Sequence, residues 1–356
     1  MYLTQMKCER FRCLAEVCFA PEPGINVIRG DNAQGKTTLL EAILFAATSK
    51  SHRTASEGDL VQYGAEGFSV RTWAQRADRE ITIEANWWQG AKRFKVNGVA
   101  QTRLSDILGR LNVVLFSPED VELVKGGAAS RRRFLDMEIS QIDAGYLNAL
   151  QQYRQVLRQR NELLRVPQPD PSLVAVWDAQ LARHGASVIT GRAGFIEELS
   201  GRAAQAYARI AESESFAVAY QPDVRSPEDL AAVLDKSRDS DIRRRMTQRG
   251  PHRDDLEILI GEHPARHYGS QGQQKTAALA LRLAELDLVR AHIGEYPVLL
   301  LDEVLAELDA HRAERLLGAI GPEVQCIMTT TERERSRIPF AAKASFRVER
   351  GCLEKE

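Results

Sequence analysis

The sequence predicts an α/β protein that is built around a phosphate-binding loop and interrupted by a mainly helical insertion. Residues 30–38, GDNAQGKTT, follow a short apolar run and precede a stretch with helical periodicity. Residues 296–303, YPVLLLDE, form an apolar run that ends in two acidic side chains. Between these two segments, residues 146–212 carry apolar side chains at helical spacing. A chain of 356 residues is long enough for two domains.

The first α/β half begins with a strand at residues 24–30, GINVIRG, and a helix after Lys36. Residues 68–74 and 81–87 alternate apolar and polar side chains, which predicts two strands with one buried face each. The Asn97–Gly98 pair predicts a hairpin turn. The segment NVVLF at residues 112–116 predicts a buried strand that stops at Ser117–Pro118.

The insertion is predicted to contain an antiparallel helical hairpin. Residues 146–165 carry Leu147, Leu150, Tyr153 and Leu157 along one stripe, and the proline-rich VPQPDPS segment then ends this helix. A second helical stretch is expected at residues 173–212. Its glycines at positions 185 and 191 are candidate interruptions.

The α/β pattern returns after Asp255. The expected elements are a strand at 256–260, a helix at 275–292, a strand in PVLLLDE, a helix at 309–320, and strands at 324–329 and 345–349. We therefore expect an α/β head formed by residues 1–116 and 250–356, with residues 117–249 as an inserted helical lobe.

The overall charge indicates no particular partner, because 48 Lys and Arg balance 49 Asp and Glu to a net charge of −1. A surface for nucleic acid would have to be a local patch. The opening residues MYLTQMKCERFRC lack the apolar core of a secretory signal, and no run of apolar residues is long enough for a membrane span. We expect a cytoplasmic protein.

The phosphate loop has the form G-x-x-x-x-G-K-[ST]. Its glycines allow successive backbone N–H groups to face one centre, and the helix that follows directs its positive end to the same point. Lys36 supplies a charge for the β- and γ-phosphates, and the Thr37 hydroxyl is suited to coordinate Mg²⁺. The expected ATP-binding residues here are Gly30, Asp31, Asn32, Ala33, Gln34, Gly35, Lys36, Thr37 and Thr38.

Two further segments carry polar groups suited to the same nucleotide. Asp302 and Glu303 follow a buried strand, so we expect Asp302 to bind Mg²⁺ directly or through one of its ligands, and Glu303 to polarise the attacking water. YGSQGQQKTAALAL opens a strongly helical stretch, where Ser270, Gly272 and Gln273 could receive a second phosphate on a helix N-terminus. Taken alone, this segment is equally consistent with an ordinary polar helix cap.

In this order, the phosphate loop, the Ser-x-Gly-Gln cap, the LLLDE strand and LAELD resemble the ABC-type ATPases. The chain further resembles the SMC-like DNA-repair branch, and within it the RecF family of recombination mediators. The matching segments are ERFRCL, SHRT, FSPEDVELVKGGAASRRRFLD, RGPHRDD and GSQGQQKTAALALRLAE. The resemblance spans the chain and implies an ABC-type P-loop ATPase head with a mixed sheet and a mainly helical second lobe.

The resemblance also implies a dimer in which two copies face each other head to tail with ATP and Mg²⁺ between them. Ser270, Gly272 and Gln273 would contact the γ-phosphate bound by the other copy, and Asp309 would lie at the dimer interface. Arg12 in ERFRCL and Arg53 in SHRT resemble positions that approach the nucleotide. Their simpler interpretation is as surface arginines.

By the same resemblance, the activity is a weak, DNA-dependent hydrolysis of ATP that acts as a switch. Transporter ATPases carry a histidine after the penultimate strand, whereas this chain has MTTTERER at 328–335, with Thr330 as the counterpart. The implied role is recombinational repair and replication-fork maintenance within the SOS response, by loading recombinase at single-strand gaps. The implied partners are duplex DNA, strand junctions, and RecO- and RecR-type mediator proteins.

Clustered arginines are the candidate DNA contacts, because guanidinium groups neutralise phosphates without reading sequence. Their alternative interpretation is as solvated helix faces paired with acids. Two other functions stay open: the nucleotide-binding subunit of an ABC transporter, and a structural or nuclease-coupled head. The candidate DNA-binding residues are Arg131, Arg132, Arg133, Arg243, Arg244 and Arg245.

Overall fold

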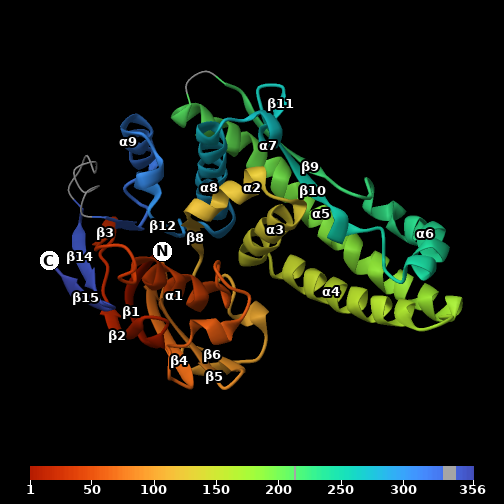
Figure 1. The fold of residues 1–356 in the computed structure, drawn as a ribbon, viewed down its shortest axis with the longest axis horizontal. Coiled ribbons are helices and arrows are strands. Elements are labelled where there is room, and N and C mark those ends of the chain that lie inside the picture. Colours follow the sequence, from red (N-terminus) through yellow and green to blue (C-terminus); the bar gives the residue numbers. More distant parts are fainter. Residues whose placement is uncertain (212–213, 332–341) are drawn as a thin grey trace. The chain divides into compact units, whose positions relative to one another are not determined.

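A computed structural model describes residues 1–211, 214–331 and 342–356 (Figure 1). The chain folds into two compact units. The first unit comprises Met1–Val121, Gln205–Glu214 and Lys275–Glu356, and the second comprises Glu122–Ala204 and Ser215–Gln274. Both units are therefore assembled from stretches that are distant in the sequence.

One sheet of the first unit is mixed, as the sequence predicted. Its strand order is β15-β14-β3-β13-β12-β8, and all neighbours are parallel except the β14–β15 pair. The strands are β3 (Ile25–Arg29), β8 (Val113–Phe116), β12 (Val298–Leu301), β13 (Cys326–Thr330), β14 (Ala344–Glu349) and β15 (Cys352–Lys355). Strands β8, β12 and β13 are buried along their whole length, which explains the uninterrupted apolar sequences of β8 and β12. Strand β3 lies between β13 and β14, which come from the opposite end of the chain.

The other six-stranded sheet of the first unit is antiparallel, with the order β2-β1-β4-β5-β6-β7. Its strands are β1 (Tyr2–Phe11), β2 (Leu14–Phe19), β4 (Gly67–Gln75), β5 (Glu80–Trp88), β6 (Ala91–Val96) and β7 (Val99–Gln101). The alternation predicted for β4 and β5 is confirmed, because the side chains predicted to face inward are buried except for Trp87, which is partly buried. The predicted turn at Asn97 and Gly98 joins β6 to β7, with φ angles of 50° and 78°.

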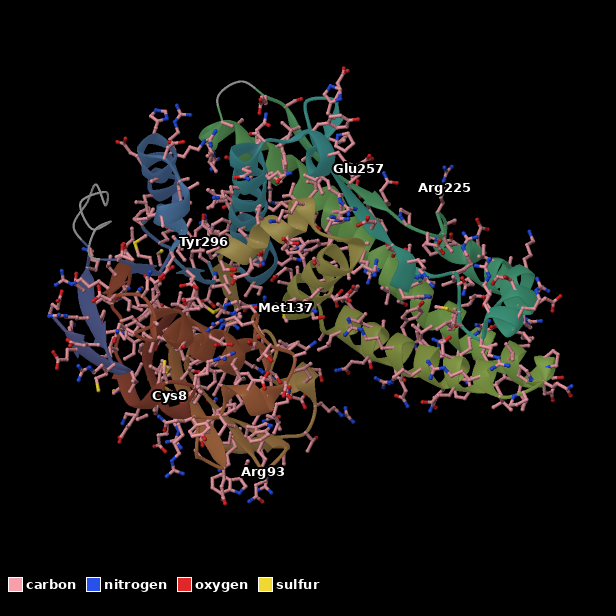
Figure 2. All side chains as sticks on the ribbon, in the orientation of Figure 1. Cys8, Arg93, Met137, Arg225, Glu257 and Tyr296 are labelled. Carbon is pink, nitrogen blue, oxygen red and sulfur yellow. The ribbon has the colours of Figure 1, made fainter. Side chains whose placement is uncertain are left out.

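Helix α1 (Lys36–Thr48) packs against strands of both sheets. All of its residues except Thr37 are buried, so the helix is enclosed on every side rather than amphipathic. Phe45 on this helix packs edge to face on Phe68, with ring centroids 5.2 Å apart. Cys8, labelled in Figure 2, belongs to the same core.

The first unit also contains α9 (Ala310–Ala319) and most of α8 (Gln271–Ile293). Its short 3₁₀ turns are η1 (Glu57–Leu60), η2 (Leu104–Asp106), η3 (Pro118–Asp120) and η6 (Val304–Glu307). Across the described residues of both units, no helix combines the length and apolar character needed to span a membrane.

The second unit is mainly helical and contains one small antiparallel sheet with the order β11-β10-β9. Its helices are α2 (Val121–Lys125), α3 (Ala128–Ile142), α4 (Ala144–Arg165), α5 (Pro171–Ile210, to Ala204), α6 (Leu230–Arg244) and α7 (Ala265–Tyr268), with 3₁₀ turns η4 (Pro227–Asp229) and η5 (Pro251–Arg253). Its strands are β9 (Phe216–Gln221), β10 (Asp255–Ile260) and β11 (His263–Pro264). This agrees with the expected helical lobe.

The predicted helical hairpin is formed by α4 and α5. Tyr146 contacts Arg192 and Arg160 contacts Asp178, so positions later in α4 meet positions earlier in α5, as two antiparallel helices require. The predicted interruptions of the second helix were wrong, because α5 is continuous through Gly185 and Gly191. A Cβ at Gly191 would lie 2.6 Å from Cδ2 of Tyr146, so this glycine is explained by close packing.

The predicted return to the head at residue 250 also differs from the structure. Residues 250–274 belong to the second unit, because β10 pairs along its length with β9 from the insertion. Conversely, the segment Gln205–Glu214, which begins within α5, belongs to the first unit. The predicted start of the insertion at 117 lies close to the observed change of unit after Val121.

Candidate nucleotide site

The phosphate loop lies between β3 and α1, as predicted. A Cβ at Gly30 would lie 2.3 Å from the carbonyl oxygen of Val348, so a larger residue is excluded there. Gly35 caps α1 with φ of 112°, and no side chain caps the helix. The first N–H groups of α1 are therefore open to an anion, at the positive end of the helix.

Lys36 is buried and its ammonium group is held inside the loop. Nζ donates hydrogen bonds to the carbonyl oxygens of Gly30 (2.9 Å) and Asp31 (3.0 Å), and it lies 3.2 Å from Oε1 of Glu303. The lysine predicted for the phosphates and the glutamate predicted for catalysis thus form one ion pair.

Thr37 and Asp302 meet beneath the start of α1. Oγ1 of Thr37 donates to Oδ1 of Asp302 at 3.0 Å, and Oγ1 of Thr329 donates to the same oxygen at 2.7 Å. Burial raises the pKa of Asp302, although these two hydrogen bonds act in the opposite direction. Among the described residues, no group of three His, Cys, Asp or Glu side chains is placed so that it could hold a metal ion. One hydroxyl and one carboxylate instead fit Mg²⁺, which commonly takes few protein ligands together with substrate phosphates.

Glu303 begins the turn after β12 in a left-handed conformation with φ of 49°. Its backbone N–H donates to Oγ1 of Thr329 at 2.9 Å, which fixes the turn on the next strand, β13. The Glu303 side chain is about one-third exposed (36%), whereas Asp302 is buried. The two carboxylates therefore have separate environments, one beside the Thr37 hydroxyl and one open to water.

Thr329 is a functional candidate that the sequence interpretation missed, because the pattern after the penultimate strand indicated its neighbour Thr330 instead. Thr330 is fully buried at the end of β13, and its hydroxyl donates to the carbonyl oxygen of Thr331 at 3.3 Å. Residues 332–335 of the MTTTERER segment lie outside the described residues. The alternation of side chains along β13 could have distinguished the two threonines, since they point to opposite faces.

The turn between β14 and β15 contacts the phosphate loop and supports it. Nothing in the local sequence indicates this contact. Backbone N–H groups of Arg350 and Gly351 donate to Oε1 (2.6 Å) and the carbonyl oxygen (3.1 Å) of Gln34. Gly351 has φ of 77°, and a Cβ there would lie 2.3 Å from the carbonyl oxygen of Cys13. The hairpin turn thus packs closely against both the phosphate loop and the β1–β2 turn.

Arg12 and Arg53 lie in the first unit and share one partner, the carboxylate of Glu41 on α1. The structure therefore brings together two arginines from separate segments, and their contact with a nucleotide stays a prediction. Glu41 was not among the predicted site residues, since an acidic residue within a helix carries no distinctive sequence pattern.

Ser270, Gly272 and Gln273 lie in the second unit at the start of α8. The Ser270 N–H donates to Oε1 of Gln273 (2.7 Å), and the Gln273 N–H donates to Oγ of Ser270 (3.2 Å). This reciprocal pair is a capping box, so the polar-cap interpretation is satisfied in the isolated chain. Asp309 in the first unit caps α9, where its carboxylate accepts from the Arg312 N–H at 2.9 Å.

The six candidate DNA-binding arginines divide by exposure. Arg131 is buried and binds both carboxylate oxygens of Asp255, at 2.6 and 2.9 Å, so its guanidinium has a structural role and is not offered to DNA. Arg132 donates to the carbonyl oxygen of Asp254 at 2.7 Å and is partly buried. The exposed members are Arg133, Arg243, Arg244 and Arg245.

The RGPHRDD segment is also structural. Its Asp254 is fully buried, lies 2.8 Å from Nη1 of Arg192, and accepts from the Tyr220 hydroxyl. Its His252 contacts the Tyr153 hydroxyl through Nδ1 at 2.6 Å. The segment therefore joins α4, α5 and β9 inside the second unit.

A glycine-rich loop before α1, a strand of the same mixed sheet that ends in a carboxylate, and a helical second unit define an ABC-type P-loop ATPase head. The family model described as the RecF/RecN/SMC N terminal domain matches residues 2–350, and the chain belongs to this family.

Relatives and solved structures agree with this assignment. The chain is 43% identical over 346 residues to the DNA replication and repair protein RecF of Symbiobacterium thermophilum, covering 94% of this chain and 92% of that protein. It is 38% identical to the RecF of Limosilactobacillus reuteri, covering 100% and 99%.

A solved structure of the recombination mediator protein RecF, RecF-ATPrS in the RecFOR pathway, matches with a TM-score of 0.92 and 36% identity, covering 99% of this chain and 98% of that one. The Smc head domain of Pyrococcus furiosus matches with a TM-score of 0.60 and 19% identity, covering 100% of this chain and 96% of that one, which supports the fold alone. The mixed-sheet ATPase head predicted from sequence is thereby confirmed.

Proposed function

We propose that the chain binds ATP and Mg²⁺ at the phosphate loop and acts in recombinational DNA repair. The observation that carries the proposal is the contact between Thr37 and Asp302, which are 265 positions apart yet within 3.0 Å beneath the uncapped start of α1. Full-length relatives that are DNA replication and repair proteins favour this role over the transporter alternative. The same relationship supports a place in the cytoplasm with DNA.

The proposed chemistry assigns one task to each group at the site. Backbone N–H groups of residues 30–38 and Lys36 hold the phosphates, while Thr37 and Asp302 hold Mg²⁺, which supplies charge neutralisation at the phosphates. Glu303, which is partly exposed, accepts a proton from the attacking water. A threonine rather than a histidine at position 330 supports slow turnover, and we propose a weak, DNA-dependent ATPase.

We further propose that ATP joins two copies of the chain. Ser270 and Gln273 cap each other in the single chain, and in a dimer they would exchange these contacts for a γ-phosphate bound by the partner copy. Gly272 permits close approach of that phosphate, and Asp309 contributes to the interface between the two copies. Binding energy for dimerisation would then depend on a phosphate that hydrolysis removes.

The proposed DNA contact uses the exposed arginines at positions 133 and 243–245, without base specificity. In the RecFOR pathway, to which the matched RecF structure belongs, the expected protein partners are RecO- and RecR-type mediators. Loading of recombinase at single-strand gaps and junctions is the proposed outcome.

The test is the mass of the protein in solution, measured by light scattering with and without ATP and duplex DNA. Wild type should become a dimer with ATP, Lys36→Met should stay monomeric, and Ser270→Arg should bind ATP without dimerising. Glu303→Gln should remain a dimer on DNA because hydrolysis is blocked. A wild-type protein that stays monomeric at saturating ATP would contradict the dimer proposal, and full turnover by Glu303→Gln would exclude its catalytic role.

A further inference from the structure

Glu41 is a buried carboxylate next to the proposed nucleotide site. It lies on α1, four residues after Thr37, and its side chain is fully buried. An ionised carboxylate in such a place is costly unless it is paired. The groups that pair with Glu41 therefore indicate the role of its charge.

Those partners come from two loops that are distant in the sequence. Oε1 of Glu41 accepts from Nη2 of Arg12 at 2.9 Å, and Oε2 lies 2.6 Å from Nε of the same guanidinium. Oε2 also lies 3.7 Å from Nη1 of Arg53. Oγ of Ser51 donates to Oε1 at 2.5 Å.

Ser51 also forms hydrogen bonds with the backbone of its own loop. The Ser51 hydroxyl oxygen accepts from the N–H groups of Arg53 (2.9 Å) and Thr54 (3.1 Å). Arg12 is fixed from the other side, since it has φ of 51° in the β1–β2 turn and its N–H donates to the carbonyl oxygen of Leu60 at 2.7 Å. Glu41 thus holds the base of both loops against the helix that follows the phosphate loop.

The charges around Glu41 do not cancel. Two guanidinium groups face one carboxylate, so the cluster keeps a charge of +1, and the side chains of Arg12 and Arg53 remain 22% and 40% exposed. Without Glu41 the two cations would repel each other. With it, they are held close together and turned partly to solvent, as the binding of a polyanion requires.

We propose that Glu41 is a positioning residue that holds Arg12 and Arg53 as a cationic pair for the phosphates of the bound nucleotide. The inference rests on the proposed function in that a nucleotide occupies the phosphate loop. Glu41 itself does not touch the nucleotide and acts through the two arginines.

The test compares Glu41→Gln with wild type by titration with ATPγS and by ATP turnover. The amide keeps the size of the side chain but not its charge, and the Kd for ATPγS and the KM for ATP should rise about tenfold while kcat stays within about twofold. Glu84→Gln is the matched control, because it breaks a Glu–Arg pair of the same unit (Glu84–Arg71, 2.9 Å) and should leave both constants unchanged. Circular dichroism and thermal unfolding establish that each variant is folded.

A double-mutant cycle separates positioning from a general structural role. In a variant that already carries Arg12→Ala and Arg53→Ala, adding Glu41→Gln should change the Kd for ATPγS less than about twofold. The reason is that the two arginines through which Glu41 acts are then absent. Should Glu41→Gln fail to fold, Ser51→Ala releases only the 51–54 loop and should still weaken ATPγS binding severalfold.

An unchanged Kd in a folded Glu41→Gln variant would overturn the inference, as would an equal effect in the double-arginine background. If Glu41→Gln does not fold, an unchanged Kd in Ser51→Ala has the same meaning. Failure of the proposed function looks different, since wild type itself would then not bind ATPγS.

Discussion

Gly351→Ala is expected to disturb the phosphate loop from the far end of the chain. The residue lies in the β14–β15 turn with φ of 77°, and its N–H donates to the Gln34 carbonyl oxygen at 3.1 Å. An added Cβ would stand 2.3 Å from the carbonyl oxygen of Cys13, which is backbone and cannot rotate away. The hairpin turn must therefore move off the loop to admit a methyl group.

The magnitude follows from two separable costs. A left-handed conformation costs a non-glycine residue about 1–2 kcal/mol, and forced overlap in a packed region costs about 1–3 kcal/mol more. Gly98→Ala is a matched control, because Gly98 has φ of 78° in the β6–β7 turn with nothing within 4 Å of its added Cβ. It should carry only the first cost.

Denaturant unfolding and titration with ATPγS measure the two consequences. Gly351→Ala should be less stable than Gly98→Ala by about 1–3 kcal/mol, and it should bind the nucleotide severalfold more weakly, while Gly98→Ala binds as wild type does. Equal stability and equal nucleotide affinity in the two variants would refute the idea that this turn supports the loop.

Three further outcomes are expected. Gly191→Ala should destabilise the protein by up to about 2 kcal/mol, because overlap with Tyr146 costs about 1–3 kcal/mol and the higher helix propensity of alanine offsets about 1 kcal/mol. Gly194→Ala has open space at its Cβ and should stabilise the protein by up to about 1 kcal/mol. Thermal unfolding that shows the same sign for both variants would contradict this packing. Burial lowers the pKa of His252 from 6.5 to about 4, so on acidification the unfolded state binds the proton before the folded state does. The free energy of unfolding should therefore fall as the pH drops from about 6.5 to 4. Denaturant titrations should show a weaker pH dependence for His252→Gln. Arg131→Ala should lower the free energy of unfolding by about 3 kcal/mol. Arg133→Ala should change it by less than about 0.5 kcal/mol and should weaken the binding of duplex DNA, as measured by fluorescence anisotropy. The reverse pattern would make Arg133 the structural residue and Arg131 the DNA contact.

The parts of the fold that follow from local pattern could be predicted from sequence. The glycine spacing around Lys36 predicts a strand, a turn and a helix within a few residues. Four consecutive apolar residues predict the buried strand that precedes Asp302. Parallel strands deliver their carboxyl ends to one edge, so the meeting of these two motifs also follows. The Ser270 cap could be placed on a helix start for the same local reason.

The parts that depend on distant contacts could not be predicted. Whether Arg131 faces solvent is decided by Asp255, 124 positions away, and a run of three arginines looks identical in either case. The glycine at 191 resembles a helix interruption until Tyr146 is known to lie against it. The end of the insertion was misplaced for a similar reason, since β10 pairs backward with a strand of the inserted segment.

The central position of β3 in its sheet has a consequence for folding. Its two neighbours, β13 and β14, come from much later in the sequence. The segment GDNAQGKTT therefore lacks its neighbouring strands until β13 and β14 have folded beside β3, and nucleotide affinity should arise abruptly with that pairing.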